Sequence, residues 1–147
     1  MFAALRQRAR DMAGIAALCR AAEAVARADG VSEPAAEHFL LAALEMEDES
    51  AARAWAALGQ NRETLRAAIE GQYADALASV GVDAANAPGE ALADTPPPGL
   101  FQASGSGQAL LQAMAAKARP TPFRSVEVLA AAATLRHGVL PRALRRL

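Results

Sequence analysis

The sequence is poor in cysteine, aromatic residues and long apolar runs, and each shortage excludes a class of protein. Its single cysteine, Cys19, leaves no disulfide framework within the chain. Aromatic residues make up 4% of the chain, too few for the stacking surfaces that bind single-stranded nucleic acid. Its apolar runs fall short of the roughly 20 residues that span a membrane. Three arginines in residues 1–10 are followed by Asp11 rather than by a signal-peptide core. We therefore expect a cytoplasmic protein with no membrane partner.

Alanine is the residue that the sequence has in abundance. It fills 41 of the 147 positions, and apolar residues together make up 53% of the chain. Alanine is the best helix former and is depleted in strands. The length suits one domain with a core of its own. The composition therefore predicts a single soluble domain of the all-α class.

Charge is spread unevenly along the chain although the net charge is −1. Residues 1–28 hold five arginines and two acids, whereas residues 29–75 hold ten acids and three arginines. Residues 100–147 hold six arginines and Lys117 against Glu127 alone. The basic C-terminal part has two interpretations. It attracts the acidic part of the same domain, or it binds a polyanion.

The second interpretation gives an alternative function, a small helical nucleic-acid-associated regulator that uses the arginine-rich face of residues 119–146. Arg142, Arg145 and Arg146 also suit the C-terminal end of a helix, where a cation complements the helix dipole. Because no aromatic residues alternate with these charges, nucleic acid is the less favoured partner.

The spacing of apolar residues predicts helices separated by polar turns. The first covers residues 3–29, with an apolar stripe made of Leu5, Met12, Ile15, Cys19, Ala22 and Ala26. The others are expected at 34–46, at 51–58 with Ser50 as N-cap, at 62–77 with Asn61 as N-cap, after Ser104, at 125–137 and at 141–147. Residues 81–103 are rich in proline and glycine and predict a linker.

The order of these helices repeats on either side of the linker. Shifting the sequence by 90 residues aligns Glu37 with Glu127 and Ala43 with Ala133. The shared order is a long helix followed by two shorter ones. We therefore predict a duplicated helical unit, with repeat one at 1–80, the linker at 81–103 and repeat two at 104–147.

The helix predicted at 34–46, in the first repeat, opens with a specific motif. It reads Ala36-Glu37-His38-Phe39-Leu40-Leu41-Ala42-Ala43-Leu44, followed by Ser50-Ala51-Ala52-Arg53 and Leu58-Gly59. The pattern resembles one repeat of the Clp N-terminal domain, the domain at the front of the AAA+ Clp unfoldases. There a Thr-Glu-His opens an apolar helix and a Val-Ala-Ala-Arg helix ends at Leu-Gly. The second repeat resembles it through Val126-Glu127-Val128-Leu129, Phe123 and Leu140-Pro141-Arg142.

The resemblance implies two four-helix repeats with pseudo-twofold symmetry, the second truncated at its last helix. In that family the domain receives protein substrates or adaptors, and in some members it binds phosphoarginine-bearing proteins through the repeat glutamates. The matching positions are Glu37 and Glu127, with Phe123 at the loop aromatic. Ala36 and Val126 replace the family's threonine. An alternative role for both glutamates is to stabilise a helix N-terminus.

Motifs for catalysis and for cofactors are missing from the sequence. It has no Gly-x-x-x-x-Gly-Lys-[Ser/Thr] loop for ATP, and its two histidines lie in different repeats. The acidic run at 45–49 lacks the ligand spacing of a calcium loop. We therefore expect a non-enzymatic protein-interaction module with no metal and no cofactor. Its partner would be a protein substrate, an adaptor or a Clp subunit, bound in a groove near Glu37, Phe123 and Glu127.

Overall fold

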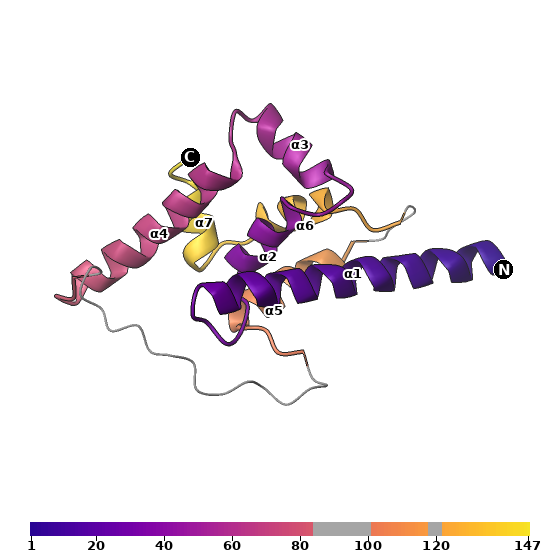
Figure 1. The fold of residues 1–147 in the computed structure, drawn as a ribbon, viewed down its shortest axis with the longest axis horizontal. Coiled ribbons are helices and arrows are strands. Elements are labelled where there is room, and N and C mark those ends of the chain that lie inside the picture. The colour runs from indigo at the N-terminus through magenta and orange to yellow at the C-terminus, as the bar shows by residue number, and fades with distance from the viewer. Residues whose placement is uncertain (84–100, 118–121) are drawn as a thin grey trace.

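The computed structural model describes residues 1–83, 101–117 and 122–147, and every regular element in those ranges is a helix (Figure 1). The helices are α1 (Phe2–Ala28), α2 (Ala36–Ala43), α3 (Ser50–Ala57), α4 (Arg62–Ser79), α5 (Gly105–Ala115), α6 (Val126–Ala132) and α7 (Val139–Leu144). The all-α prediction is therefore confirmed for this part of the chain. Most of the predicted linker, at 84–100, lies outside the described residues. Over the described ranges, none of the helices combines the length and apolar character needed to cross a membrane.

Helix α2 lies at the centre of the fold. All eight of its residues are buried, and it contacts α1, α4, α5, α6 and α7. Its largest side chains, Phe39, Leu40 and Leu41, point in different directions around the helix and are all fully buried. A helix this short is unstable alone in water. The surrounding helices therefore hold α2 in place by burying it on every side.

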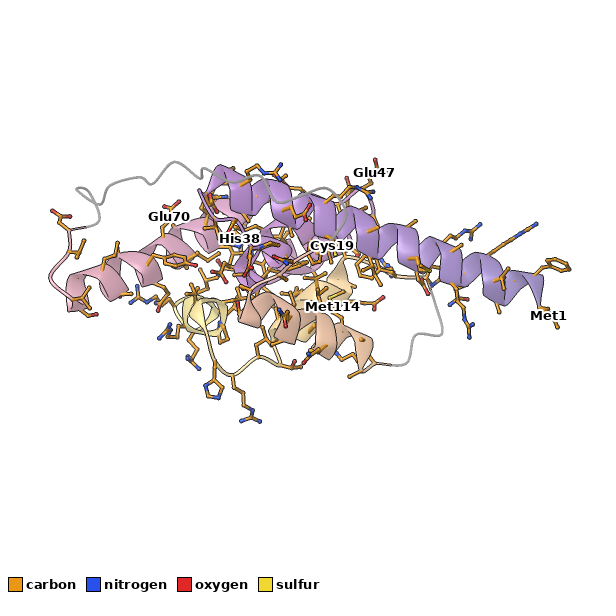
Figure 2. The ribbon with its side chains drawn as sticks, turned by 90° about the horizontal axis from the view of Figure 1, so that it is seen from below. Met1, Cys19, His38, Glu47, Glu70 and Met114 are labelled. Atoms are coloured by element: carbon orange, nitrogen blue, oxygen red, sulfur yellow. The ribbon has the colours of Figure 1, made fainter. Side chains whose placement is uncertain are left out.

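The apolar stripe predicted along α1 is buried only in its second half. Ala22 and Ala26 are fully buried, but Leu5 and Met12 are 66% and 72% exposed. The prediction was wrong for these two residues because α1 is about 40 Å long and its N-terminal part extends beyond the other helices. Its N-terminal turns extend past the other helices in both views (Figures 1 and 2).

The helix predicted over 125–137 is also shorter than expected and ends at Ala132. Thr134 and Leu135 bond back three residues, to the carbonyls of Ala131 and Ala132, which tightens and closes the last turn. The Thr134 hydroxyl donates a second bond to Ala131 O, at 2.7 Å. The chain then turns at Gly138, whose φ of +110° suits glycine, before α7 begins.

Ser50 does not cap its own helix as predicted. It is the first residue of α3, and Glu49, with φ +52°, precedes it. The Ser50 Oγ instead accepts a hydrogen bond from the first backbone N–H of α6, at Val126 (3.0 Å). In return, the Ser125 Oγ accepts one from Ala51 N in α3 (3.1 Å). Each serine therefore caps the other's helix.

Asp48 completes this cluster of Asp48, Ser50 and Ser125. Its Oδ2 accepts bonds from the Ser50 hydroxyl at 2.5 Å and from Ser125 N at 3.0 Å. The Ser125 hydroxyl is then left to donate to Ser50 Oγ, at 3.0 Å. Partial burial raises the pKa of Asp48, but the hydrogen bonds from Ser125 and Ser50 and the charge of Arg124 outweigh it and leave the pKa below its ordinary value. The carboxylate thus stays ionised beside two helix N-termini, where a negative charge is favourable.

Ser125→Ala is expected to lower the free energy of unfolding by about 1–3 kcal/mol, because it removes the cap of α3 and leaves buried donors and acceptors without partners. Urea denaturation followed by circular dichroism measures this change. Ser79→Ala is the matched control, since the Ser79 hydroxyl is exposed, and its effect should stay within about 0.5 kcal/mol. Equal stability of the two variants would contradict the capping role of Ser125.

Candidate functional site

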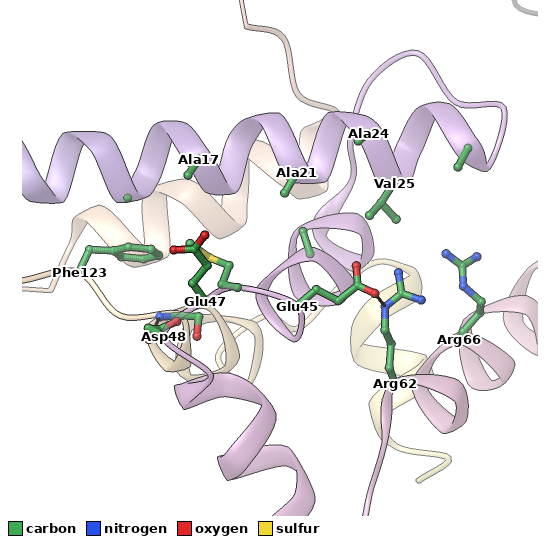
Figure 3. Close-up of a pocket in the computed structure, with 15 residues that line it drawn as sticks. Ala17, Ala21, Ala24, Val25, Glu45, Glu47, Asp48, Arg62, Arg66 and Phe123 are labelled. Carbon is green, nitrogen blue, oxygen red and sulfur yellow. Dashed lines mark hydrogen bonds and ion pairs between the residues drawn. The ribbon is translucent and has the colours of Figure 1, made fainter.

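A groove of about 810 Å³ runs along α1 and is open to solvent (Figure 3). We call it the α1 groove. Its floor is one side of α1, formed by Gly14, Ala17, Ala21, Ala24, Val25 and Ala28. Its opposite wall comes from the end of α2, the acidic loop at 45–48 and two arginines of α4, and Phe123 and Ser125 close one end.

The residues of the floor share one side of α1 because they recur every three or four positions along it. Nearly all of them are glycine or alanine, so few side-chain atoms project from the floor. At Gly14 a side chain would displace Phe123. A Cβ built there would come within 2.7 Å of the Phe123 ring. The Phe123 backbone N–H donates to Asp11 Oδ1 of α1 at 2.7 Å, which holds the ring against the helix. Phe123 therefore forms a fixed aromatic end to the groove.

Most charges that line the groove already have partners. Arg62 Nε lies 3.1 Å from Glu45 Oε1, Arg66 pairs with Asp29 at 2.9 Å, and Asp48 belongs to the serine cluster. Glu47 differs, because its exposed carboxylate has no hydrogen bond or ion pair with any residue that the structure describes. Figure 3 shows it pointing from the loop toward α1. Glu47 therefore gives the groove an exposed carboxylate without a partner in the described part of the chain.

Glu37, the first of the predicted ligand-binding glutamates, is almost fully buried. It is 2% exposed, and its Oε1 accepts a hydrogen bond from the Tyr73 hydroxyl of α4 at 2.5 Å. Burial and this hydrogen bond to a carboxylate raise the pKa of Tyr73. Glu37 is not among the residues that line the α1 groove. Its carboxylate thus joins α2 to α4 inside the domain.

Glu127 and Phe123, the other two predicted site residues, lie at the start of α6. Glu127 is half-buried, and its Oε1 accepts a bond from Arg124 N at 3.0 Å, as a carboxylate at a helix N-terminus does. It does not line the α1 groove, whereas Phe123 does. Of the three predicted residues, the structure therefore brings only Phe123 to the groove.

His38 stabilises the start of α2. Its Nδ1 accepts a hydrogen bond from Ala35 N at 2.8 Å, and its Nε2 lies 3.6 Å from Asp29 Oδ2. Burial lowers the pKa of His38, although the charges of Glu37 and Asp29 act in the opposite direction. The neutral ring is the form that can accept the bond from Ala35. His38 therefore serves the fold in its unprotonated form.

The remaining reactive groups do not form a cluster of metal ligands in the described residues. Over these residues, no three side chains of histidine, cysteine, aspartate or glutamate cluster as metal ligands would. Cys19 is half-buried, and burial raises the pKa of its thiol, which disfavours the reactive thiolate.

The arginine-rich stretch predicted over 119–146 lies partly outside the described residues, which resume at position 122. Within the described part, Arg146 forms an ion pair with Asp75 of α4. Helices α4 and α7 also pack against each other. At least this arginine is therefore engaged by the acidic part of the same domain.

We expect His38 to make the domain less stable in mild acid. Its folded pKa lies below the ordinary value near 6.5, so the unfolded chain binds the proton more readily and the free energy of unfolding falls as the pH drops from 7 toward 5. His38→Gln keeps an acceptor for Ala35 N but cannot titrate, and should flatten this slope by up to about 1.4 kcal/mol per pH unit. Urea denaturation at several pH values measures the slope of the free energy of unfolding against pH. His137→Gln, which removes an exposed imidazole, is the control, and identical slopes in all three proteins would contradict the role of His38.

Comparison of the chain with models of protein families, with characterised proteins and with solved structures gave no match in any of the three. Membership of the Clp N-terminal family therefore stays a prediction from the sequence motif. The functional argument depends on the residues of the α1 groove themselves.

Proposed function

We propose that this chain is a non-catalytic protein-interaction module whose α1 groove binds a segment of a protein substrate, an adaptor or a Clp subunit. The observation that carries the proposal is the groove itself. It has an apolar floor of small residues, a fixed aromatic end at Phe123 and the carboxylate of Glu47, which has no partner among the residues that the structure describes. Grooves that bind peptides combine these features, apolar area for affinity and a few polar groups for orientation.

The floor of the groove favours a peptide over a small polar ligand. Ala17, Ala21 and Ala24 place no bulky side chain between α1 and an incoming segment, so the partner's backbone can approach closely and its larger side chains can fill the space. The length of α1 along the floor, from Gly14 to Ala28, is about 21 Å. A segment of several residues can lie along it.

The order of the helices supports a Clp N-terminal-like architecture as part of the proposal. A long helix and two short ones come before α4, and α5, α6 and α7 follow in a similar order. Glu37 and Glu127 lie in the first turns of the corresponding helices α2 and α6. We propose that both glutamates stabilise the fold, because Glu37 is bonded to Tyr73 and Glu127 to Arg124 N. The partner surface is then the α1 groove and includes Phe123, and a phosphoarginine ligand is not part of the proposal.

Ala21→Trp should weaken partner binding roughly ten-fold or more, because the indole would fill the floor of the groove. Binding of the full chain to purified Clp unfoldase, Clp protease subunits and a partly unfolded client protein is measured by biolayer interferometry. Ala76→Trp, which adds the same side chain at an exposed position of α4, is the control and should bind as the wild type does. Wild-type binding that Ala21→Trp leaves unchanged would remove the groove from the function. Failure of the wild type to bind any of these proteins would overturn the proposal.

A further inference from the structure

The first turns of α1 carry an apolar stripe that no described part of the chain covers. Phe2, Leu5 and Met12 are 83%, 66% and 72% exposed, and Ala9 between them is exposed as well. Their spacing of three, four and three residues places them on one side of the helix. Soluble domains rarely leave several large apolar side chains together in water, so a stripe of this kind indicates a binding surface.

The stripe belongs to a basic helix. Arg8 lies at one edge of it and Arg6 at the other, and both are exposed, as is Arg10 farther from the stripe. A helix of this kind suits a partner surface that is apolar in the middle and negative at its edge. The α1 groove is such a surface, because its floor is apolar and Glu47 on its wall has no partner among the described residues.

The stripe cannot reach the groove of its own chain. At 100° per residue, it points about 130° around α1 from the side that forms the groove floor. Both surfaces lie on one continuous helix, α1, so no bend can bring them together. The groove of another molecule is under no such constraint.

The two surfaces match in length and in side-chain size. Residues 2–12 span about 15 Å, and the groove floor spans about 21 Å. The stripe offers large side chains where the floor offers glycine, alanine and one valine. Since arginines flank the stripe on both sides, either direction of the helix brings one of them next to Glu47.

We propose that the α1 groove binds residues 2–12 of a second copy of this chain, with the Phe2–Leu5–Met12 stripe on the alanine floor and Arg6 or Arg8 beside Glu47. The inference rests on the proposed function, because it uses the same groove. The stripe and the groove are different surfaces, so the contact is head-to-tail and can add further copies. Self-association therefore competes with partner proteins for the groove.

Sedimentation of the full chain over a range of concentrations tests the proposal. The wild type should associate beyond a dimer as its concentration rises, and less so in high salt. The double substitution Leu5→Glu and Met12→Glu, at exposed positions, should weaken association roughly ten-fold or more. Glu47→Lys should weaken it several-fold, whereas the matched control Glu49→Lys, on the same loop but outside the groove, should not.

Mixing two defective variants tests the head-to-tail geometry. The Leu5→Glu/Met12→Glu chain keeps its groove, and the Ala21→Trp chain keeps its stripe. Each should be monomeric alone, and the mixture should form a one-to-one dimer that grows no further. A mixture that stays monomeric would show that the stripe does not enter the groove, and association of the Ala21→Trp chain alone would show that the stripes pair with each other. Either result would overturn the proposal. Equal stability of the two variants and the wild type in urea shows that all of them fold.

The remaining outcomes separate this inference from the proposed function. A wild type that stays monomeric to about 1 mM overturns the inference, including the case in which the stripe binds anionic lipid vesicles instead. If Clp subunits or client proteins still bind the groove in that case, the proposed function stands alone. The Leu5→Glu/Met12→Glu chain should bind those partners at least as tightly as the wild type, because it cannot block the grooves of its neighbours.

Discussion

The exchange of caps between Ser50 and Ser125 is the interaction on which the rest of the fold depends. Helices α3 and α6 have eight and seven residues, and neither has a side-chain cap from its own N-cap residue. Such short helices need their first N–H groups satisfied. Because each hydroxyl comes from the other helix, 75 residues away, the capping of each helix depends on the position of the other. Asp48 places one negative charge where both helix dipoles benefit from it. The buried α2 packs against α6, whose start this cluster joins to α3.

Much of the helical structure could be predicted from the sequence because its signals are local. Asn61 and Ser104 each cap the helix that follows them, and alanine-rich spacing marks α1 and α4. Ser50 shows where local signals fail, since a serine before a helix has the same sequence pattern whether its hydroxyl serves that helix or a distant one. Leu5 and Met12 show a second limit. Periodicity identifies residues that share a face of a helix, but the point at which the body of the domain ends depends on how all the helices pack.

The candidate site was less predictable than the fold. Phe123 was found through a motif and lies in the α1 groove, whereas the roles of Gly14 and Glu47 emerge only from tertiary structure. Gly14 did carry a signal, since a glycine inside a helix costs about 1 kcal/mol relative to alanine and implies a close neighbour. Glu47 carried none. It is one of four acids in a short run, and it differs from the other three only because they have partners: Glu45 pairs with Arg62, Asp48 with the two serines and Glu49 with Arg53.

Trp55 gives the molecule an optical property that follows from its position. It is the only tryptophan in the chain, it is 5% exposed, and its Nε1–H donates to Asn61 O at 2.9 Å across the turn between α3 and α4. It borders a separate apolar hollow with Val126, Leu129 and Leu147 and is not among the residues that line the α1 groove. Its fluorescence therefore reports whether the α3–α4 junction is folded against the second half of the chain. Binding in the groove can then be followed with a fluorescent label on the partner. Folding and binding are thus measured at two different wavelengths in one sample.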